Sequence, residues 1–229
     1  MKKIIALLLV VVLIFSLSAC GQNNDSSSSA PSSTPSENIT SSPGIPYSPE
    51  VDPQNDPFDK VVGNKVDSLP FRGSKKFTVK PSTGIWFSTI TINPDGSFEG
   101  AYRETASDVD EEYYPNGHIL LCDFHGNFSE FKQVDQFTYA IKLDTLYAEL
   151  APEESWLDSG YYYETVSPLC VEGGYVFYLY LPGKPTSELT DAELNWFFGN
   201  VPTTLDTFAI TNSYVADAGY NATYTFFAD

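Results

Sequence analysis

Residues 85–103, IWFSTITINPDGSFEGAYR, decide the fold of this chain. Two extended runs, 85–92 and 97–103, are rich in β-branched and aromatic side chains, which pack well on a pleated sheet. The Asn-Pro-Asp-Gly sequence between them is typical of a turn. We therefore expect an antiparallel β-hairpin here.

More strands follow toward the C-terminus. Residues 118–131 indicate one long strand, or a tight hairpin with Gly126-Asn127 at its tip. Residues 175–181 carry apolar side chains on both faces, so both sides of that strand require cover. Residues 137–143 alternate strictly, which predicts that Phe137, Tyr139, Ile141 and Leu143 share the buried face and that Thr138, Ala140 and Lys142 face solvent.

One helix is expected in the second half of the chain. Thr190-Asp-Ala-Glu193 matches the capping-box pattern, and the apolar segment 194–198 ends before Gly199. This pattern predicts a short helix that caps one end of the sheet. The last expected strands, 208–211 and 223–227, follow it.

Many short strands with a single helix indicate an all-β antiparallel domain. Residues 58–229 number 172 and hold 32 of the 34 aromatic residues, which suits one domain with a large core. The order of adjacent hairpins favours an antiparallel β-barrel, lipocalin-like in outline. A β-sandwich is the alternative.

The segment before this domain has a different composition. Residues 21–57 hold ten Ser and seven Pro, with no Lys or Arg. Such a segment cannot bury enough apolar surface to offset the entropy of ordering it. We expect residues 20–57 to be a disordered tether, with a root-mean-square reach of about 30 to 37 Å.

The first twenty residues, MKKIIALLLVVVLIFSLSAC, have the parts of a secretory signal: two lysines, an apolar core and small residues before Cys20. The Leu-Ser-Ala-Cys ending resembles the lipobox of bacterial lipoproteins. This resemblance implies a signal peptide over residues 1–19, cleavage after Ala19, and a mature chain anchored to the extracytoplasmic face of the cell membrane by lipid on Cys20. A retained spanning helix is disfavoured because the apolar run is shorter than the roughly 20 residues it requires.

Three further segments resemble an uncharacterised family of lipoproteins from low-GC Gram-positive bacteria (Firmicutes). They are GIWFSTITINPDGSFEGAY, YYPNGHILLCDFHGNFSEF and VDQFTYAIKL, between Gly84 and Leu146. The resemblance covers about a third of the chain and supports a location in the cell envelope. It implies no activity and no functional residue. The loop 104–116 departs from the family, because it is rich in tyrosine and acids where the relatives are richer in glycine.

The charge excludes one class of partner. Without residues 1–19 the chain keeps ten basic and 30 acidic residues, a net charge of −20. Nucleic acid is not an expected partner, because its phosphates require clustered Lys and Arg.

The metal-ligand types do not form a convincing site. Strand alternation places His118 and Cys122 on one face and Asp123 and His125 on the other, so no shared metal ion and no cofactor is predicted. The acids Asp108, Asp110 and Glu112 resemble part of a calcium loop. They lack the glycine and the bidentate glutamate of the EF-hand, which favours a solvated acidic loop over a weak calcium site.

The two cysteines of the domain leave two interpretations open. Export to an oxidising compartment allows a disulfide between Cys122 and Cys170. The other interpretation is a pair of buried free thiols.

Aromatic side chains are the candidate ligand-binding groups, because they combine a large contact area with a polar handle. The candidates are Tyr161, Tyr163, Tyr178, Tyr180 and Trp196. The alternative is that these side chains belong to the core.

The sequence lacks the nucleophile elbow, the His-Glu-x-x-His pair and the phosphate-binding glycine loop. A hydrolase of the glycoside hydrolase type, with two carboxylates, is the enzyme that it leaves open. We expect a non-catalytic envelope lipoprotein that binds a small ligand, a glycan or a protein. A structural or assembly lipoprotein without ligand is the competing class, favoured if Tyr178, Tyr180 and Trp196 are buried.

Overall fold

The computed structural model describes residues 44–108, 110–215 and 221–229. The expected signal peptide, Cys20 and most of the expected tether lie outside the described residues. Eight strands form the body of the domain: β3 (Lys75–Val79), β4 (Trp86–Ile92), β5 (Ser97–Ala106), β6 (Gly117–Gln133), β7 (Thr138–Ala148), β10 (Val176–Tyr180), β11 (Ala209–Val215) and β12 (Asn221–Ala228).

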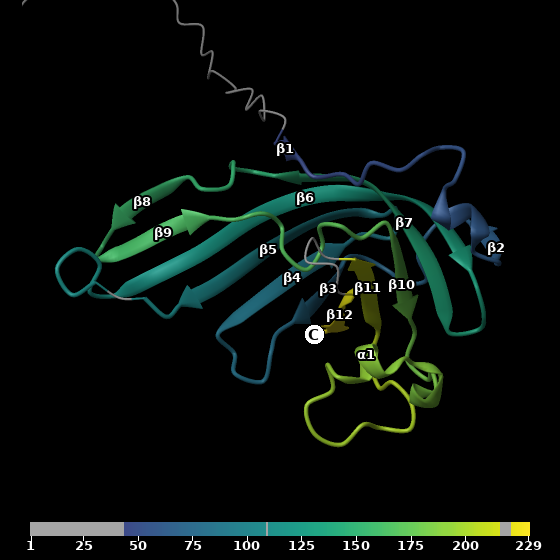
Figure 1. Ribbon diagram of the computed structural model, residues 1–229. Coiled ribbons are helices and arrows are strands. Elements are labelled where there is room, and N and C mark those ends of the chain that lie inside the picture. Colours follow the sequence, from purple (N-terminus) through teal and green to yellow (C-terminus); the bar gives the residue numbers. More distant parts are fainter. Residues whose placement is uncertain (1–43, 109, 216–220) are drawn as a thin grey trace, which may run out of the picture. The chain divides into compact units, whose positions relative to one another are not determined.

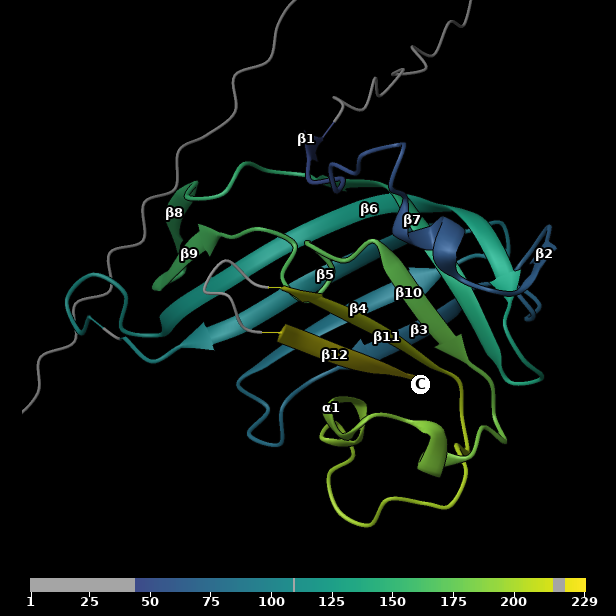
Figure 2. The ribbon, with the colours of Figure 1, turned by 45° about the vertical axis from the view of Figure 1, so that its right-hand side comes forward.

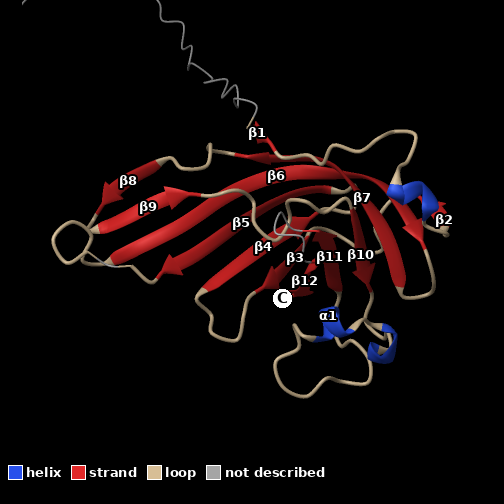
Figure 3. Ribbon diagram, in the orientation of Figure 1, coloured by secondary structure: helices blue, strands red, loops and turns tan. Residues whose placement is uncertain are grey.

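These eight strands close into an antiparallel β-barrel (Figures 1 and 3). Each strand pairs with the next one in the order β3-β4-β5-β6-β7-β10-β11-β12, and β12 returns to β3. The predicted barrel is therefore confirmed, and the sandwich alternative is wrong. The hairpin of residues 85–103 is present as β4 and β5, and residues 118–131 form one strand, β6, rather than a hairpin.

The remaining elements decorate the barrel. They are β1 (Ile45–Pro46), β2 (Asn64–Val66), β8 (Ser155–Asp158), β9 (Tyr161–Thr165), the 3-10 helices η1 (Pro57–Lys60) and η2 (Thr186–Glu188), and the helix α1 (Asp191–Leu194). Strands β8 and β9 form a hairpin that continues the sheet beside the first part of β6, to which β9 runs parallel (Figure 2).

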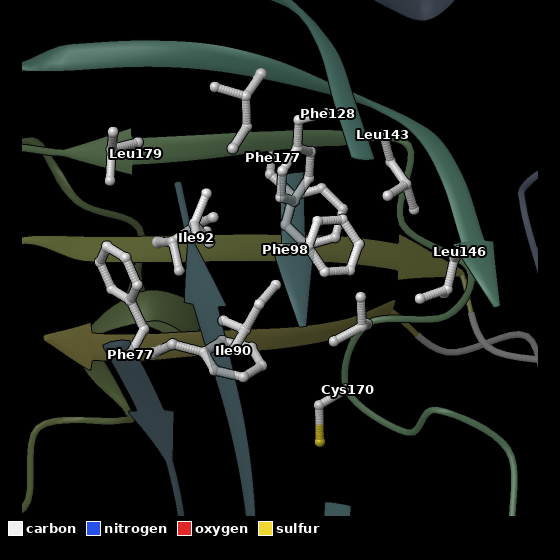
Figure 4. Packing of buried hydrophobic residues seen from close by; sticks show 14 of the residues in the cluster. Phe77, Ile90, Ile92, Phe98, Phe128, Leu143, Leu146, Cys170, Phe177 and Leu179 are labelled. Carbon is white, nitrogen blue, oxygen red and sulfur yellow. The ribbon is translucent and has the colours of Figure 1, made fainter. Parts of the chain in front are cut away.

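Phenylalanine side chains fill the inside of the barrel (Figure 4). The ring of Phe128, from β6, lies 4.8 Å from that of Phe98 and 5.1 Å from that of Phe177, between centroids. Two glycines make room for this packing: a Cβ at Gly100 would meet the ring of Phe124, and a Cβ at Gly126 would meet the ring of Phe98. The closed eight-stranded antiparallel barrel is lipocalin-like in outline, and side chains fill its inside.

The outer face is also covered over part of the barrel. The connection 181–208, which contains α1, packs over β10, β11 and β12, where a second apolar cluster buries Tyr180, Leu189, Leu205 and Ala209. The helix therefore packs on the outer face of these strands near their ends, because Tyr180 ends β10, Ala209 begins β11 and Phe227 lies one residue before the end of β12 (Figure 2). The prediction that residues 175–181 need cover on both sides is confirmed.

Residues 44–61 cover another part of the outer face. Phe58 is fully buried, and Lys132 Nζ donates to the Phe58 main-chain oxygen over 2.7 Å. Thr138 and Ala140 are buried, contrary to the prediction that they face solvent. Ala140 lies beside this cover, because its partner across the sheet is Lys132, whereas the Thr138 hydroxyl donates to Asp135, which also binds Lys184. The folded body therefore includes residues within the expected tether 20–57, because Tyr47 packs against the core and Asp56 caps η1. The composition of this segment, rich in Pro and Ser, did not predict these contacts.

The barrel closes least completely between β12 and β3. Two residue pairs join these strands, Phe227 with Thr78 and Ala228 with Phe77, whereas seven pairs join β11 and β12. We call this boundary the seam. The first part of β12 runs along it without a β3 partner.

Candidate functional site

Trp196 lies at the seam, just after α1. Its indole Nε1 donates a hydrogen bond to the main-chain oxygen of Thr223 in β12, over 2.7 Å. The ring centroid lies 5.9 Å from that of Trp86 and 5.5 Å from that of Tyr224. An indole ring thus takes the position beside β12 that a longer β3 would take.

Two hollows of about 390 and 200 Å³ share Trp196 and Phe198 in their walls. The larger is completed by Pro81, Ser82, Ala192, Asn195, Asn221 and Thr223, and the smaller runs along the C-terminal half of β12 to Lys80 and Asp229. Phe198 is 55% exposed. We call the two hollows together the seam groove. Exposed aromatic faces with a few amides and hydroxyls around them are the composition of small-molecule sites.

Tyr178 and Tyr180 lie elsewhere, on the outer face of β10. Tyr180 is 8% exposed, and its hydroxyl donates to Glu193 Oε1 over 2.6 Å. Burial, and then this hydrogen bond, raise the pKa of Tyr180. Glu193 Oε2 accepts from the Thr190 N–H, so the predicted capping box is present. Tyr180 therefore holds α1 against the barrel, while the half-buried Tyr178 lines a separate hollow of about 480 Å³.

Tyr161 and Tyr163 lie on the β8–β9 hairpin. Trp156 of β8 stacks on Tyr163 at 5.3 Å between centroids and an interplanar angle of 12°, and Tyr161 lies 6.1 Å from Tyr163. The five predicted aromatic residues thus fall in three separate places and do not form one platform. Of the three whose burial was to distinguish the function classes, Tyr180 is buried and the other two are half-buried.

His118 is held between two carboxylates. Its Nδ1 lies 3.0 Å from Asp108 Oδ1, and its Nε2 lies 3.1 Å from Glu164 Oε2, although without the alignment of a hydrogen bond. The hydrogen bond with His118 is the main cause that lowers the pKa of Asp108. His118 of β6 thus links Asp108, in the loop before β6, with Glu164 of β9.

The other predicted ligand types do not converge on His118. Cys122 is buried on the same face, whereas Asp123 pairs with Arg103 over 2.6 Å and His125 with Glu149 over 2.9 Å on the outer face. The predicted alternation is confirmed. No three His, Cys, Asp or Glu side chains converge as a metal site within the described ranges.

The calcium candidates have other partners in the loop before β6. Asp110 Oδ1 accepts the main-chain N–H groups of Glu112 and Tyr113 over 2.9 and 3.0 Å, and so closes a turn. Asp108 is engaged by His118, and Glu112 is exposed.

Among the described residues, Cys122 and Cys170 are buried free thiols, which agrees with the second interpretation of the sequence and not with a disulfide. Burial raises the pKa of Cys122 to about 12 and also raises that of Cys170. Cys170 belongs to a turn packed against the barrel core, and the Asn212 side chain donates to its main-chain oxygen over 3.1 Å. A thiol that is protonated and covered in this way is unreactive.

Comparison with protein-family models, curated proteins and solved structures finds no match to this chain. Within the part of the chain that the structure describes, none of the helices has the length and apolar character needed to cross a membrane. The assignment of a candidate site therefore depends on the geometry of this structure alone.

Two site residues were missed by sequence reasoning. Phe198 was treated as the end of an apolar helix, and Trp156 was assigned to no element. The signal for Phe198 is Gly199, which adopts a φ of +112°. The helix itself ends at Leu194, so Phe198 lies in the irregular segment between the helix and this glycine, where its side chain is exposed.

Proposed function

We propose that this protein is a lipid-anchored lipoprotein of the extracytoplasmic membrane face, and that its barrel binds a glycan of the cell envelope in the seam groove without catalysis. The observation that carries the proposal is the pair Trp196 and Phe198. Phe198 is largely exposed in the wall of two hollows, and aromatic side chains with a few polar groups around them are the usual lining of ligand pockets. The lipobox resemblance at Cys20 supports the anchor.

A neutral glycan fits the groove better than an anion does. Aromatic faces offer apolar contact to the C–H faces of a sugar ring, and Asn195, Asn221 and Ser82 offer amide and hydroxyl partners to its hydroxyls. A net charge of −20 repels anions and leaves a neutral sugar unaffected.

The carboxylate alternative is less well supported. Three carboxylates line a hollow of about 470 Å³ on the outside of the barrel: Asp123, which pairs with Arg103, Glu149, which lies 2.9 Å from His125, and Glu99. Glycoside hydrolysis needs one carboxyl that stays protonated, which apolar surroundings favour and a cation opposes. A purely structural role is the remaining alternative, and it predicts an empty groove.

The proposal is tested by titrating the full chain, in a mild detergent, with a tetramer of N-acetylglucosamine while tryptophan fluorescence is recorded. Trp196 is expected to change its emission when the sugar covers it, and native mass spectrometry of protein purified from its host is expected to show a retained saccharide. Maltotetraose serves as the control sugar. Unchanged emission with the first sugar, together with an unmodified native mass, would exclude a glycan ligand.

The anchor is tested by the Cys20→Ser variant. We expect this protein to leave the membrane fraction, because each buried acyl methylene contributes about 0.8 kcal/mol and the variant carries no acyl chain. The measurement is the distribution between membrane and soluble fractions, with wild type as reference. A variant that stays firmly in the membrane would show that residues 1–19 themselves are the anchor.

A further inference from the structure

Strand β8 is an open edge of the sheet. It pairs with β9 on one side, and it has no strand on its other side among the described residues. All four of its residues are exposed, and Leu157 is 57% exposed. Natural proteins usually cover or shorten such edges, because the unpaired main-chain groups can bind another strand.

The hairpin geometry shows which main-chain groups face outward. Ser159 and Gly160 have φ values of +51° and +78°, as in a two-residue type I′ turn, which closes on a hydrogen-bonded pair. The register then alternates, so Asp158 and Trp156 face β9 while Ser155 and Leu157 present their N–H and C=O groups to the open side.

The surroundings of this edge are acidic. The chain carries no lysine or arginine between residues 104 and 131 or between residues 143 and 183. Glu154 and Asp158 flank the edge, and the acidic loop before β6 is attached to the hairpin, because Asn116 Nδ2 donates to the Ser159 main-chain oxygen over 2.8 Å. A partner strand must therefore bring positive charge.

We propose that β8 is a docking edge for an extended, lysine- or arginine-containing segment of another protein, which adds to the sheet as a further strand. Main-chain hydrogen bonds to Ser155 and Leu157 supply the binding, and the acidic surroundings select a basic partner. The exposed Trp156 ring, stacked on the half-buried Tyr163, gives apolar contact to the partner's alternate side chains. This edge is distinct from the seam groove.

A second copy of this chain is the wrong occupant for electrostatic reasons. Two β8 strands paired antiparallel about Trp156 would place Glu154 of each copy opposite Asp158 of the other. Like charges directly opposite across a strand pair are destabilising.

The experiment uses the full chain in a mild detergent and three synthetic peptides, KVKVKVK, EVEVEVE and KPKPKPK. The first has the charge and the strand propensity, the second reverses the charge, and the third keeps the charge but does not form a strand. We expect KVKVKVK to bind and to slow hydrogen exchange at the Ser155 and Leu157 amides. We expect EVEVEVE and KPKPKPK each to bind at least about tenfold more weakly.

The matched variants are Leu157→Pro and Leu157→Thr. Proline removes the outward N–H and is tolerated on an open edge, so the first is expected to weaken KVKVKVK binding by about tenfold, whereas the second keeps the N–H and most of the affinity. Hydrogen exchange of the β9 amides shows whether the hairpin stays folded in the variant. If the hairpin of Leu157→Pro unfolds, the proposal is judged from the binding of the three peptides to the wild-type chain. Equal binding of KVKVKVK and KPKPKPK, or an affinity unchanged by Leu157→Pro in a folded hairpin, would overturn the proposal.

Discussion

Replacing Gly126 with alanine is expected to lower the free energy of unfolding by about 3 kcal/mol, the cost of forcing atoms into a well-packed core. A Cβ at this position would meet the Thr145 main-chain oxygen and lie 2.5 Å from Phe98 Cζ. A backbone oxygen in a strand has nowhere to move, and Phe98 is packed on Phe128. Chemical denaturation of the full chain measures the effect.

The control for this variant is Gly84→Ala. Gly84 has a φ of +67° and nothing within 4 Å of its Cβ position, so alanine there costs only the backbone strain, about 1 kcal/mol. The φ of Gly126 lies outside the left-handed range, so its expected loss is steric. If both variants lose the same small amount, then the core around Phe98 is looser than the structure shows.

The sequence predicts those parts of the fold that depend on neighbouring residues. The turn at 93–96, the long strand β6 and the Thr190 capping box each have their causes within a few positions. The eight barrel strands pair in chain order, as the order of adjacent hairpins favours, although long connections join β7 to β10 and β10 to β11.

The parts that sequence reasoning missed depend on contacts between distant segments. Thr138 and Ala140 face outward as their alternation predicts, yet both are buried. Lys132, the cross-strand partner of Ala140, binds the main-chain oxygen of Phe58, and Lys184 binds the Asp135 carboxylate that accepts from Thr138. Strand β9 pairs in parallel with β6, and no local pattern specifies that register. Alternation along a strand separates the inner face from the outer face. It does not predict exposure where a loop covers the outer face.

The candidate site could be predicted from the sequence only in part, for the same reason. Trp196 was expected among the ligand-binding residues and lines the seam groove, but Tyr161, Tyr163 and Tyr180 do not join it. Nothing in their spacing distinguishes a tyrosine that holds α1 from one that lies on an open hairpin. Their places depend on which strand each residue meets, and pairings between strands far apart in sequence decide this.

Alanine substitutions at three consecutive aromatic residues are expected to separate ligand binding from stability. Trp196→Ala is expected to cost about 3 kcal/mol, because it removes the ring packed on Trp86 and Tyr224 and the hydrogen bond to Thr223. Phe198→Ala is expected to change the free energy of unfolding by less than about 0.5 kcal/mol, because its ring is exposed. Both variants are expected to bind the N-acetylglucosamine tetramer at least about tenfold more weakly.

Phe197 is the matched control, because its ring packs on Phe227 at 4.8 Å within the second apolar cluster and is not part of the groove wall. Phe197→Ala is expected to lose about 2 kcal/mol of stability and to keep its affinity for the sugar. Loss of binding in all three variants would mean that the sugar requires only an intact connection over β12. If only the variants at positions 196 and 198 lose binding, the sugar contacts those two rings. Lost stability cannot explain that result, because Phe198→Ala is expected to be as stable as wild type and to bind weakly, whereas Phe197→Ala is expected to be less stable and still to bind.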